Sequence, residues 1–249
     1  MRSPTNTSAV EYLMSQDVSV NTVLDVGAAK NTWALQEAFP DKKHILFEPM
    51  VEFRDECKKN YEDKKIDYEL HNVALSDIVD PHGQMFYNTH LSHAGAASYI
   101  WSGVVPKDTE SYHGNTHPKR NVSVTTLDSF LSGKTFDKPY YLKVDTDGQE
   151  MNVLRGAKGI LKDCSVIQVE SCIHSNSREC IWNQLKWFED NGFHIWDIVD
   201  MFYIDNMLWQ VDLLFISSEN YRRIKSQHKK RDITKQIFTF VGNDGSYNF

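Results

Sequence analysis

The sequence predicts an α/β fold in which helices cover both faces of one mostly parallel sheet. Short apolar segments alternate with stretches of helical periodicity along most of the 249 residues, an alternation typical of βαβ units. Two of these segments, Val23–Gly27 and Tyr141–Gly148, carry an aspartate close to a turn of small residues. Ligands bind at the carboxyl ends of the strands in such sheets, so both turns are candidate ligand-binding loops.

The strands are predicted from short apolar runs, each bounded by turn-forming residues. Five of them alternate with helical stretches and are therefore expected to be parallel. The last two follow each other directly across Asp205–Asn206, so we expect them to form an antiparallel pair. In chain order the seven strands are expected at Val20–Val26, Lys43–Glu48, Tyr68–Ala74, Tyr140–Asp145, Ser165–Glu170, Phe193–Val199 and Leu208–Ser217.

The helices are predicted from amphipathic stretches and from the residues that end them. Pro40 closes the helix before the second strand because proline cannot continue a helix. Gly192 closes the last helix, where a residue in the left-handed conformation is expected. The expected helices are residues 8–16, Thr32–Phe39, Val51–Tyr61, Gln149–Leu161 and Cys180–Asn191.

Residues 80–121 interrupt this alternation. They are dense in Pro, Gly, His and Asn, and their apolar stretches are short, so we expect an irregular insertion within one domain that spans residues 1–249. Its aromatic and polar side chains suit the rings and hydroxyls of an acceptor, and a surface excursion with its own small core explains them equally well. These side chains belong to His90, His93, Tyr99, Trp101, Tyr112, His113 and His117.

The charge distribution separates an acidic body from a basic carboxyl-terminal extension. Residues 219–249 hold seven basic and three acidic residues, a net charge of +4, whereas the whole chain has −7. The acidic body argues against a nucleic-acid substrate, which favours a basic groove lined with aromatic residues. The basic extension suits an anionic acceptor or a phosphorylated lipid carrier, and a solvated helix face is the alternative reading.

Composition also bounds the cellular setting. No run approaches the roughly 18 apolar residues that span a bilayer, and the first residues have no secretory apolar region. A cytoplasmic protein without a transmembrane segment is therefore expected, and the sequence does not indicate its oligomeric state. Reduced thiols are expected rather than a zinc site or a disulfide, because the cysteines form no CxxC pair. They are Cys57, Cys164, Cys172 and Cys180.

The turn after the first strand excludes two common nucleotide-binding loops. It reads Gly27-Ala28-Ala29-Lys30-Asn31-Thr32, which lacks both the G-x-G-x-x-G of dinucleotide sites and the G-K-[ST] of P-loops. One glycine with two alanines suits a smaller group without phosphate, such as the amino-acid part of S-adenosylmethionine. Asp25 would meet the ammonium group of that part, directly or through water. Glu48 follows Asp25 by 23 residues, about where an acid that binds ribose hydroxyls is expected.

Six segments follow one another in a characteristic order: Asp25–Ala28, Phe47–Pro49, Asn72–Asp77, Thr125–Phe130, Lys143–Glu150 and Val153–Ala157. In this order they resemble the FkbM-type family of S-adenosylmethionine-dependent methyltransferases, over about residues 22–216. The resemblance implies a Rossmann-like class I methyltransferase fold, with a seven-stranded mostly parallel sheet, an antiparallel last strand and helices on both faces. Ala29 and Asn31 stand where the family has Asn and Gly, and Asp147 replaces the commoner Glu. Asparagine tolerates the left-handed backbone conformation better than most residues, so the loop is expected to keep its form with Asn31 in place of glycine.

The resemblance implies that S-adenosylmethionine is the cofactor. The turn of residues 72–77 ends the third strand and is expected to line the adenine, with Asp77 or a backbone group reading the exocyclic amine. The expected cofactor-binding residues are Asp25, Gly27, Ala28, Asn31, Glu48, Pro49, Asn72, Val73, Ala74, Asp77 and Asp145.

The catalytic hypothesis rests on the ends of the fourth and fifth strands. Lys143 and Asp145 are two residues apart and share one face of a strand, with Asp145 nearer its carboxyl end. Asp145 and Glu170 end adjacent strands, so they are the expected base and acceptor-positioning residues. Lys143 would hold a carboxylate in place or lower the pKa of the acceptor, and His174 is a second candidate base. A turn-capping role without proton transfer is the alternative for Asp145.

A divalent cation such as Mg²⁺ is a further alternative, because oxygen ligands and one imidazole would gather at these strand ends. Its ligands would be Asp145, Asp147, Glu170 and His174.

The activity implied by the resemblance is O-methylation of a hydroxyl on a sugar, glycan or related natural product. One alternative is N-methylation of a small amine or amide, and another is a non-catalytic cofactor-binding partner subunit. Methyltransferases that act on exocyclic base or glutamine nitrogens commonly carry an Asn/Asp-Pro-Pro-aromatic turn. Asp145-Thr146-Asp147-Gly148 stands in its place here, which disfavours N-methylation.

Overall fold

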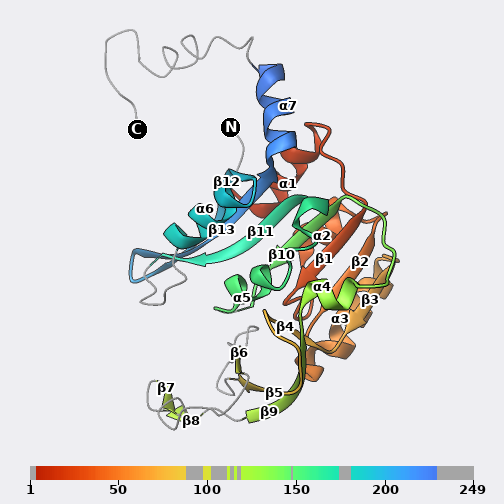
Figure 1. Ribbon diagram of the computed structural model, residues 1–249, viewed down its shortest axis with the longest axis vertical. Helices are drawn as coiled ribbons and strands as arrows, with labels where there is room; N and C mark the ends of the chain where they lie inside the picture. The colour runs from red at the N-terminus through yellow and green to blue at the C-terminus, as the bar shows by residue number, and fades with distance from the viewer. Residues whose placement is uncertain are drawn as a thin grey trace.

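The computed structural model describes residues 4–87, 98–101, 111–112, 115–116, 119–146, 148–173 and 181–228. The main sheet has seven strands in the order β12-β13-β11-β10-β1-β2-β3 (Figure 1). These strands are β1 (Thr22–Val26), β2 (Lys43–Phe47), β3 (Tyr68–His71), β10 (Tyr140–Val144), β11 (Cys164–Cys172), β12 (Phe193–Ile204) and β13 (Met207–Ser217).

The strand directions confirm the predicted mostly parallel sheet. β3, β2, β1, β10 and β11 are parallel neighbours, and β13 is antiparallel to both β11 and β12. The expected turn at Asp205–Asn206 joins the last pair with positive φ values of 49° and 63°, which two-residue hairpin turns favour. The chain runs from β1 outward to β2 and β3 and returns to β10, so the strand order reverses between β1 and β10. Ligands bind at such a reversal.

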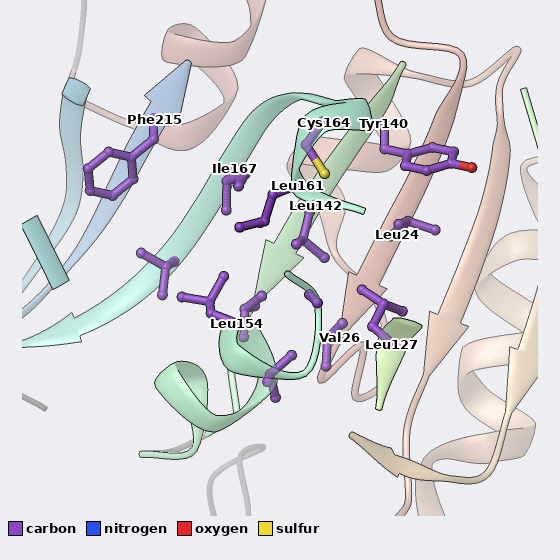
Figure 2. Close-up of a cluster of buried hydrophobic side chains, with 14 of the residues drawn as sticks. Leu24, Val26, Leu127, Tyr140, Leu142, Leu154, Leu161, Cys164, Ile167 and Phe215 are labelled. Carbon is purple, nitrogen blue, oxygen red and sulfur yellow. The ribbon is translucent and has the colours of Figure 1, made fainter. Parts of the chain in front are cut away.

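One face of the sheet carries the larger hydrophobic core. Leu24 and Leu142 of the strands belong to the same buried cluster as Leu127 and Leu154 of the covering helices (Figure 2). Side chains of alternate residues point to this face because the period of a strand is two. The helices here are α4 (Leu127–Leu131), α5 (Glu150–Arg155) and α6 (Ile181–Asp190).

The opposite face is covered by the amino-terminal helices and by the last one. Val23 and Tyr141 pack there with Leu13 and Ile224, and Leu46 joins a smaller cluster with Tyr61. None of the described helices is long and apolar enough to cross a membrane. The helices on this face are α1 (Asn6–Met14), α2 (Trp33–Ala38), α3 (Arg54–Asp63) and α7 (Ser218–His228).

The segment expected to be an irregular insertion contributes to a second sheet in the described residues. Its strand order is β4-β9-β5-β6, and Figure 1 shows it beyond the carboxyl ends of the main strands. The predicted strand Tyr68–Ala74 is too long, because the main-sheet strand ends at His71 and Ala74–Leu75 pairs with Val124–Thr125 instead. The strands outside the main sheet are β4 (Ala74–Leu75), β5 (Asp80–Tyr87), β6 (Ser98–Trp101) and β9 (Lys119–Thr125), with β7 (Ser111–Tyr112) and β8 (Asn115–Thr116) forming a separate pair.

The predicted helix Gln149–Leu161 is also too long. It ends at Arg155, and the next residue, Gly156, lies so close to the carbonyl oxygen of Ser76 that a Cβ atom there would overlap it. The carboxylate of Asp128 accepts two backbone N–H groups of the turn that follows. By contrast, Gly192 follows α6 with φ of 81°, which confirms the expected cap. Short 3₁₀ turns precede α3 and β11, at η1 (Val51–Phe53) and η3 (Leu161–Asp163).

Candidate functional site

The ends of β1 and β10 lie side by side where the strand order reverses. Asp25 of β1 is opposite Lys143 of β10 in the register of the two strands. Gly27 follows with φ of 82°, and a Cβ atom built on it would overlap the carbonyl oxygen of Asp145. Glycine at this position therefore lets the two candidate ligand-binding loops meet.

Glu48 holds the loop after β1 in its conformation. Its Oε2 accepts the backbone N–H of Ala29 at 2.8 Å, and its Oε1 accepts that of Met50 at 2.7 Å. Ala29 has φ of 46°, whereas Asn31 is not among the residues with positive φ. The loop therefore makes its left-handed turn at Ala29, two residues before Asn31.

The carboxyl group of Glu48 retains room for a polar ligand. Burial raises the pKa of Glu48 to about 7, although the N–H groups of Met50 and Ala29 act to lower it. A carboxylate oxygen can accept two hydrogen bonds, and each oxygen of Glu48 accepts one from these backbone groups. One acceptor position on each oxygen is left, which matches the two neighbouring hydroxyls of a ribose.

Asp25, Lys143 and Asp145 form a charged cluster at the centre of the site. The Nζ atom of Lys143 lies 2.9 Å from Oδ2 of Asp145 and 3.7 Å from Oδ1 of Asp25. Burial alone would lower the pKa of Lys143, but the charges of Asp145 and Asp25 raise it above its ordinary value. Oδ2 of Asp25 accepts the Thr32 hydroxyl at 2.7 Å, while its buried Oδ1 accepts no hydrogen bond from the described residues.

The cluster carries a net negative charge, and one of its side chains is partly exposed to solvent. Glu48 and Asp212, besides Asp25 and Asp145, interact electrostatically with Lys143. The side chain of Asp145 is 37% exposed, whereas that of Asp25 is fully buried. The described charges therefore favour a cationic ligand, and Asp145 is the carboxylate that an acceptor can reach.

Glu170 lies on the strand next to this cluster. Val144 and Val169 are paired across β10 and β11, so Asp145 and Glu170 are the next residues on adjacent strands, as predicted. β11 continues to Cys172, however, so the expectation that Glu170 ends its strand is wrong. Its Oε1 accepts a hydrogen bond from the Gln210 amide on β13, which holds the carboxylate against the hairpin.

A series of buried polar side chains, linked by hydrogen bonds, lies beside Lys143 and was not predicted from the sequence. The Tyr141 hydroxyl donates to Oε1 of Gln168 at 2.7 Å, and Nε2 of Gln168 donates to Oδ2 of Asp212 at 2.7 Å. The Asn6 amide donates to the same Oδ2 at 2.8 Å. Burial raises the pKa of Asp212, and the charge of Asp145 adds to this effect. The local signal was a tyrosine two residues before Lys143, on the same strand face.

Glu150 is a second residue that the sequence analysis left without a role, although it stands in one of the family segments. Its Oε1 accepts the backbone N–H groups of Thr146 at 3.0 Å and Gly148 at 2.8 Å. Burial raises the pKa of Glu150, against the lowering by these N–H groups. Glu150 thus supports the loop after β10 as Glu48 supports the loop after β1. A glutamate shortly after the strand-end aspartate was the available signal.

The turn expected to line the adenine is tied by a hydrogen bond to the backbone of Glu48. The Asn72 side-chain amide donates to the carbonyl oxygen of Glu48 at 3.0 Å. Val73 and Ala74 lead from β3 into the second sheet, and Asp77 is exposed beside Ser76, whose hydroxyl donates to it at 3.3 Å. Contacts of residues 72–77 with adenine stay a prediction.

No group of three or more histidine, cysteine, aspartate or glutamate side chains is placed to hold a metal ion within the described ranges. Two of the four candidate Mg²⁺ ligands, Asp147 and His174, lie outside those ranges, as do the side chains of the aromatic and histidine residues between 84 and 120. Cys57 and Cys164 are free thiols, and Cys180 lies outside the described ranges.

Comparisons with known proteins agree with this geometry. The sequence profile of the methyltransferase FkbM domain matches residues 25–201. The profile and the strand order of the main sheet together confirm the predicted class I methyltransferase fold. The comparison with curated protein sequences gives no match.

Several solved structures are similar to this chain at low identity. Precorrin-6y C5,15-methyltransferase from Geobacter metallireducens GS-15 has 10% identity and a TM-score of 0.44, with 83% of this chain and 86% of that chain covered. Magnesium protoporphyrin IX methyltransferase from Synechocystis PCC 6803, with bound S-adenosylmethionine, has 12% identity and a TM-score of 0.44, with coverage of 86% and 78%. An rRNA methylase from Streptococcus thermophilus has 9% identity and a TM-score of 0.45, with coverage of 84% and 93%.

Proposed function

Because this chain belongs to the methyltransferase FkbM domain family, we propose that it transfers the methyl group of S-adenosylmethionine to a hydroxyl of a sugar, glycan or related natural product. The observation that carries the proposal is the pair of Lys143 and Asp145, 2.9 Å apart, at the reversal of the strand order. Asp145 is accessible there, and the buried ammonium of Lys143 fixes its position.

The described residues fit the cofactor in three respects. The buried Oδ1 of Asp25, which lacks a hydrogen-bond donor, supports a contact with the ammonium group. The two remaining acceptor positions of Glu48 support contacts with the ribose hydroxyls. The negative charge around Lys143 supports a ligand that is cationic overall. When bound, S-adenosylmethionine supplies an electrophilic methyl group attached to a positively charged sulfur.

Asp145 is proposed to position the acceptor and to take its proton. It accepts a hydrogen bond from the acceptor hydroxyl, which directs a lone pair of the oxygen, and it takes the proton as the new O–CH₃ bond forms. Lys143 orients Asp145 by donating a hydrogen bond to its Oδ2. Alignment supplies most of the acceleration, and a positioned base adds about 10²–10⁴-fold.

The charge of the site favours this acceptor class over RNA. An RNA substrate binds through phosphates to a basic groove. Lys143 interacts with four carboxyl groups in the described site, so the described charges around the reaction centre repel phosphate.

The test is a panel of acceptors incubated with methyl-labelled S-adenosylmethionine, followed by mass spectrometry of the products. Free sugars, glycosides, small amines and RNA form the panel, and we expect label on a sugar hydroxyl. Label on amines or RNA with unlabelled sugars would overturn the acceptor assignment. If calorimetry finds equal affinity for NAD and S-adenosylmethionine, the cofactor assignment is wrong.

A further inference from the structure

The hairpin of β12 and β13 ends in an exposed apolar segment, Met201–Met207, which we call the hairpin tip. Its two turn residues, Asp205 and Asn206, are polar. The other five are large apolar or aromatic residues, each 39–55% exposed: Met201, Phe202, Tyr203, Ile204 and Met207. Contiguous exposed side chains of this kind mark interaction surfaces.

The tip belongs to an edge strand. β12 pairs with β13 on one side, and no strand pairs with its other side among the described residues. The amino-terminal segment meets β12 at Asp200, whose N–H donates to the carbonyl oxygen of Pro4 at 3.1 Å. Oδ1 of Asp200 also accepts the N–H of Asn6 at 3.2 Å. In the part of the chain that the structure describes, the outer edge from Met201 to Ile204 has no strand partner.

This edge lacks the side-chain features that usually keep edge strands from pairing with another chain. Those features are lysine, proline and inward-pointing charges. Met201–Ile204 contains none of them. The four consecutive apolar residues Met201–Ile204 are all exposed, and the register of the hairpin shifts between Val199 and Phe202 and again between Phe202 and Tyr203.

A strand that pairs alongside this edge would cover both faces at once and would satisfy the unpaired backbone groups. A partner docked on one face would cover only half of the side chains. An identical strand is self-complementary in the antiparallel direction, and a twofold axis relates most homodimers. We propose that two copies of this chain dimerise by antiparallel pairing of their hairpin tips, with Tyr203 on the twofold axis and Phe202 next to it.

The exposed area is consistent with a second copy. Ile195 and Ile198, on the same strand, are 41% and 44% exposed and extend the apolar surface. Together with the tip they present on the order of 600 Å². A standard interface buries about 800 Å² per partner, so these side chains supply most of that area and backbone atoms supply the rest.

The proposed interface adjoins the reaction site. β12 runs in the same direction as β11, so the tip lies at the carboxyl edge of the sheet, as does Asp145. Phe202 is opposite Gln210 in the hairpin register, and Gln210 donates to Glu170. The second copy would therefore stand beside the acceptor side, although dimerisation itself does not rest on the proposed function.

Sedimentation velocity of the full-length chain at micromolar concentration tests the proposal. We expect a dimer, and we expect Phe202→Lys and Tyr203→Lys each to weaken it at least about 10²-fold, as central interface residues do. Val79→Lys is the control, because Val79 is also an exposed apolar residue but lies away from the hairpin. Circular dichroism of each variant checks that it folds.

A second measurement uses the twofold axis. Only the residue on the axis of an antiparallel pair faces its own counterpart, at about 4.5–5.5 Å between Cβ atoms, and in the proposed pairing that residue is Tyr203. Tyr203→Cys should therefore form a covalent dimer on mild oxidation, whereas Ile195→Cys should not.

A chain that stays monomeric at all concentrations would overturn the proposal. So would a dimer that neither lysine variant weakens and that Tyr203→Cys does not cross-link. Flotation of a monomeric chain with phosphatidylcholine vesicles, lost in Phe202→Lys, would show that the tip binds lipid instead.

Discussion

Gly27 and Asp145 meet through their backbones, so that any side chain on Gly27 would overlap the carbonyl oxygen of Asp145. This contact joins the loop after β1 to the loop after β10. The proposed cofactor residues and the proposed base therefore share one junction, and a change at Gly27 must displace one of the two loops.

Gly27→Ala should destabilise the protein and weaken cofactor binding together. Gly133→Ala is the matched control, because Gly133 also has positive φ, 75°, but no atom lies within 4 Å of its added Cβ. Gly133→Ala introduces only the strain of a left-handed backbone conformation, which costs roughly 1–2 kcal/mol of stability. Gly27→Ala should cost at least about 2 kcal/mol more through overlap, measured by urea unfolding. Equal losses in the two variants would show that the junction is not tight.

Asp145→Asn should reduce turnover at least about 10²-fold while cofactor affinity changes little. The amide keeps the shape of the carboxylate but can neither take a proton nor pair with the Lys143 ammonium. Initial rates and calorimetry on the same preparation separate the two effects. Near-normal turnover would make Asp145 a structural residue and would leave His174 as the candidate base.

Glu170→Gln should lower turnover in the same direction, and the double variant with Asp145→Asn should be non-additive if both carboxylates act on one acceptor. A chelator distinguishes a metal from a simple base. Loss of activity on chelation that Mg²⁺ restores would favour metal ligation by these carboxylates.

Cofactor affinity should rise with pH up to about 7. Burial raises the pKa of Glu48 to about 7, from 4.5 for an exposed glutamate. The fold thus favours the protonated form of Glu48. The stability that this form contributes is lost as the pH rises from 4.5 to about 7. Ribose hydroxyls that donate to Glu48 favour the ionised form, so binding below pH 7 should release a proton. Calorimetry in buffers of different ionisation enthalpy measures that release, which Glu48→Gln should abolish.

Ala29→Asn should stabilise the protein by about 0.5–1 kcal/mol. Ala29 holds φ of 46°, which asparagine tolerates better than alanine, and the N–H that donates to Glu48 is unchanged. Thermal unfolding measures the effect. Asn31→Gly is the control, since Asn31 does not have positive φ and should gain nothing. A larger gain in the control would contradict the observed loop conformation.

The sequence predicted the main sheet because its strands carry strong local signals. Val23–Val26 and Tyr141–Val144 are apolar, β-branched or aromatic runs bounded by turns, and the hairpin turn at Asp205–Asn206 is short. The second sheet has no comparable signal. Ala74–Leu75 is two residues long, too short for any periodicity, and its partner Val124–Thr125 lies far away in the chain.

The residues of the candidate site that could be predicted are those whose position follows from the nearby sequence. Asp25, Glu48, Lys143 and Asp145 stand at strand ends, and the structure brings them together. The supporting contacts depend on distant parts of the chain or on backbone N–H groups, which the residue pattern does not show. Asp212 is the extreme case, because its partner Asn6 is 206 residues away.

That separation has a consequence for synthesis. Asn6 leaves the ribosome 206 residues before Asp212, which accepts a hydrogen bond from the Asn6 side-chain amide. Until Asp212 emerges, the series of buried polar side chains beside Lys143 lacks its acceptor, and α1 has no strand β13 to close against. The first helix of the nascent protein therefore cannot complete its packing until β13 has been translated. Pairings between such distant segments also slow folding. We expect the reaction centre to be completed only after Asp212 has emerged from the ribosome.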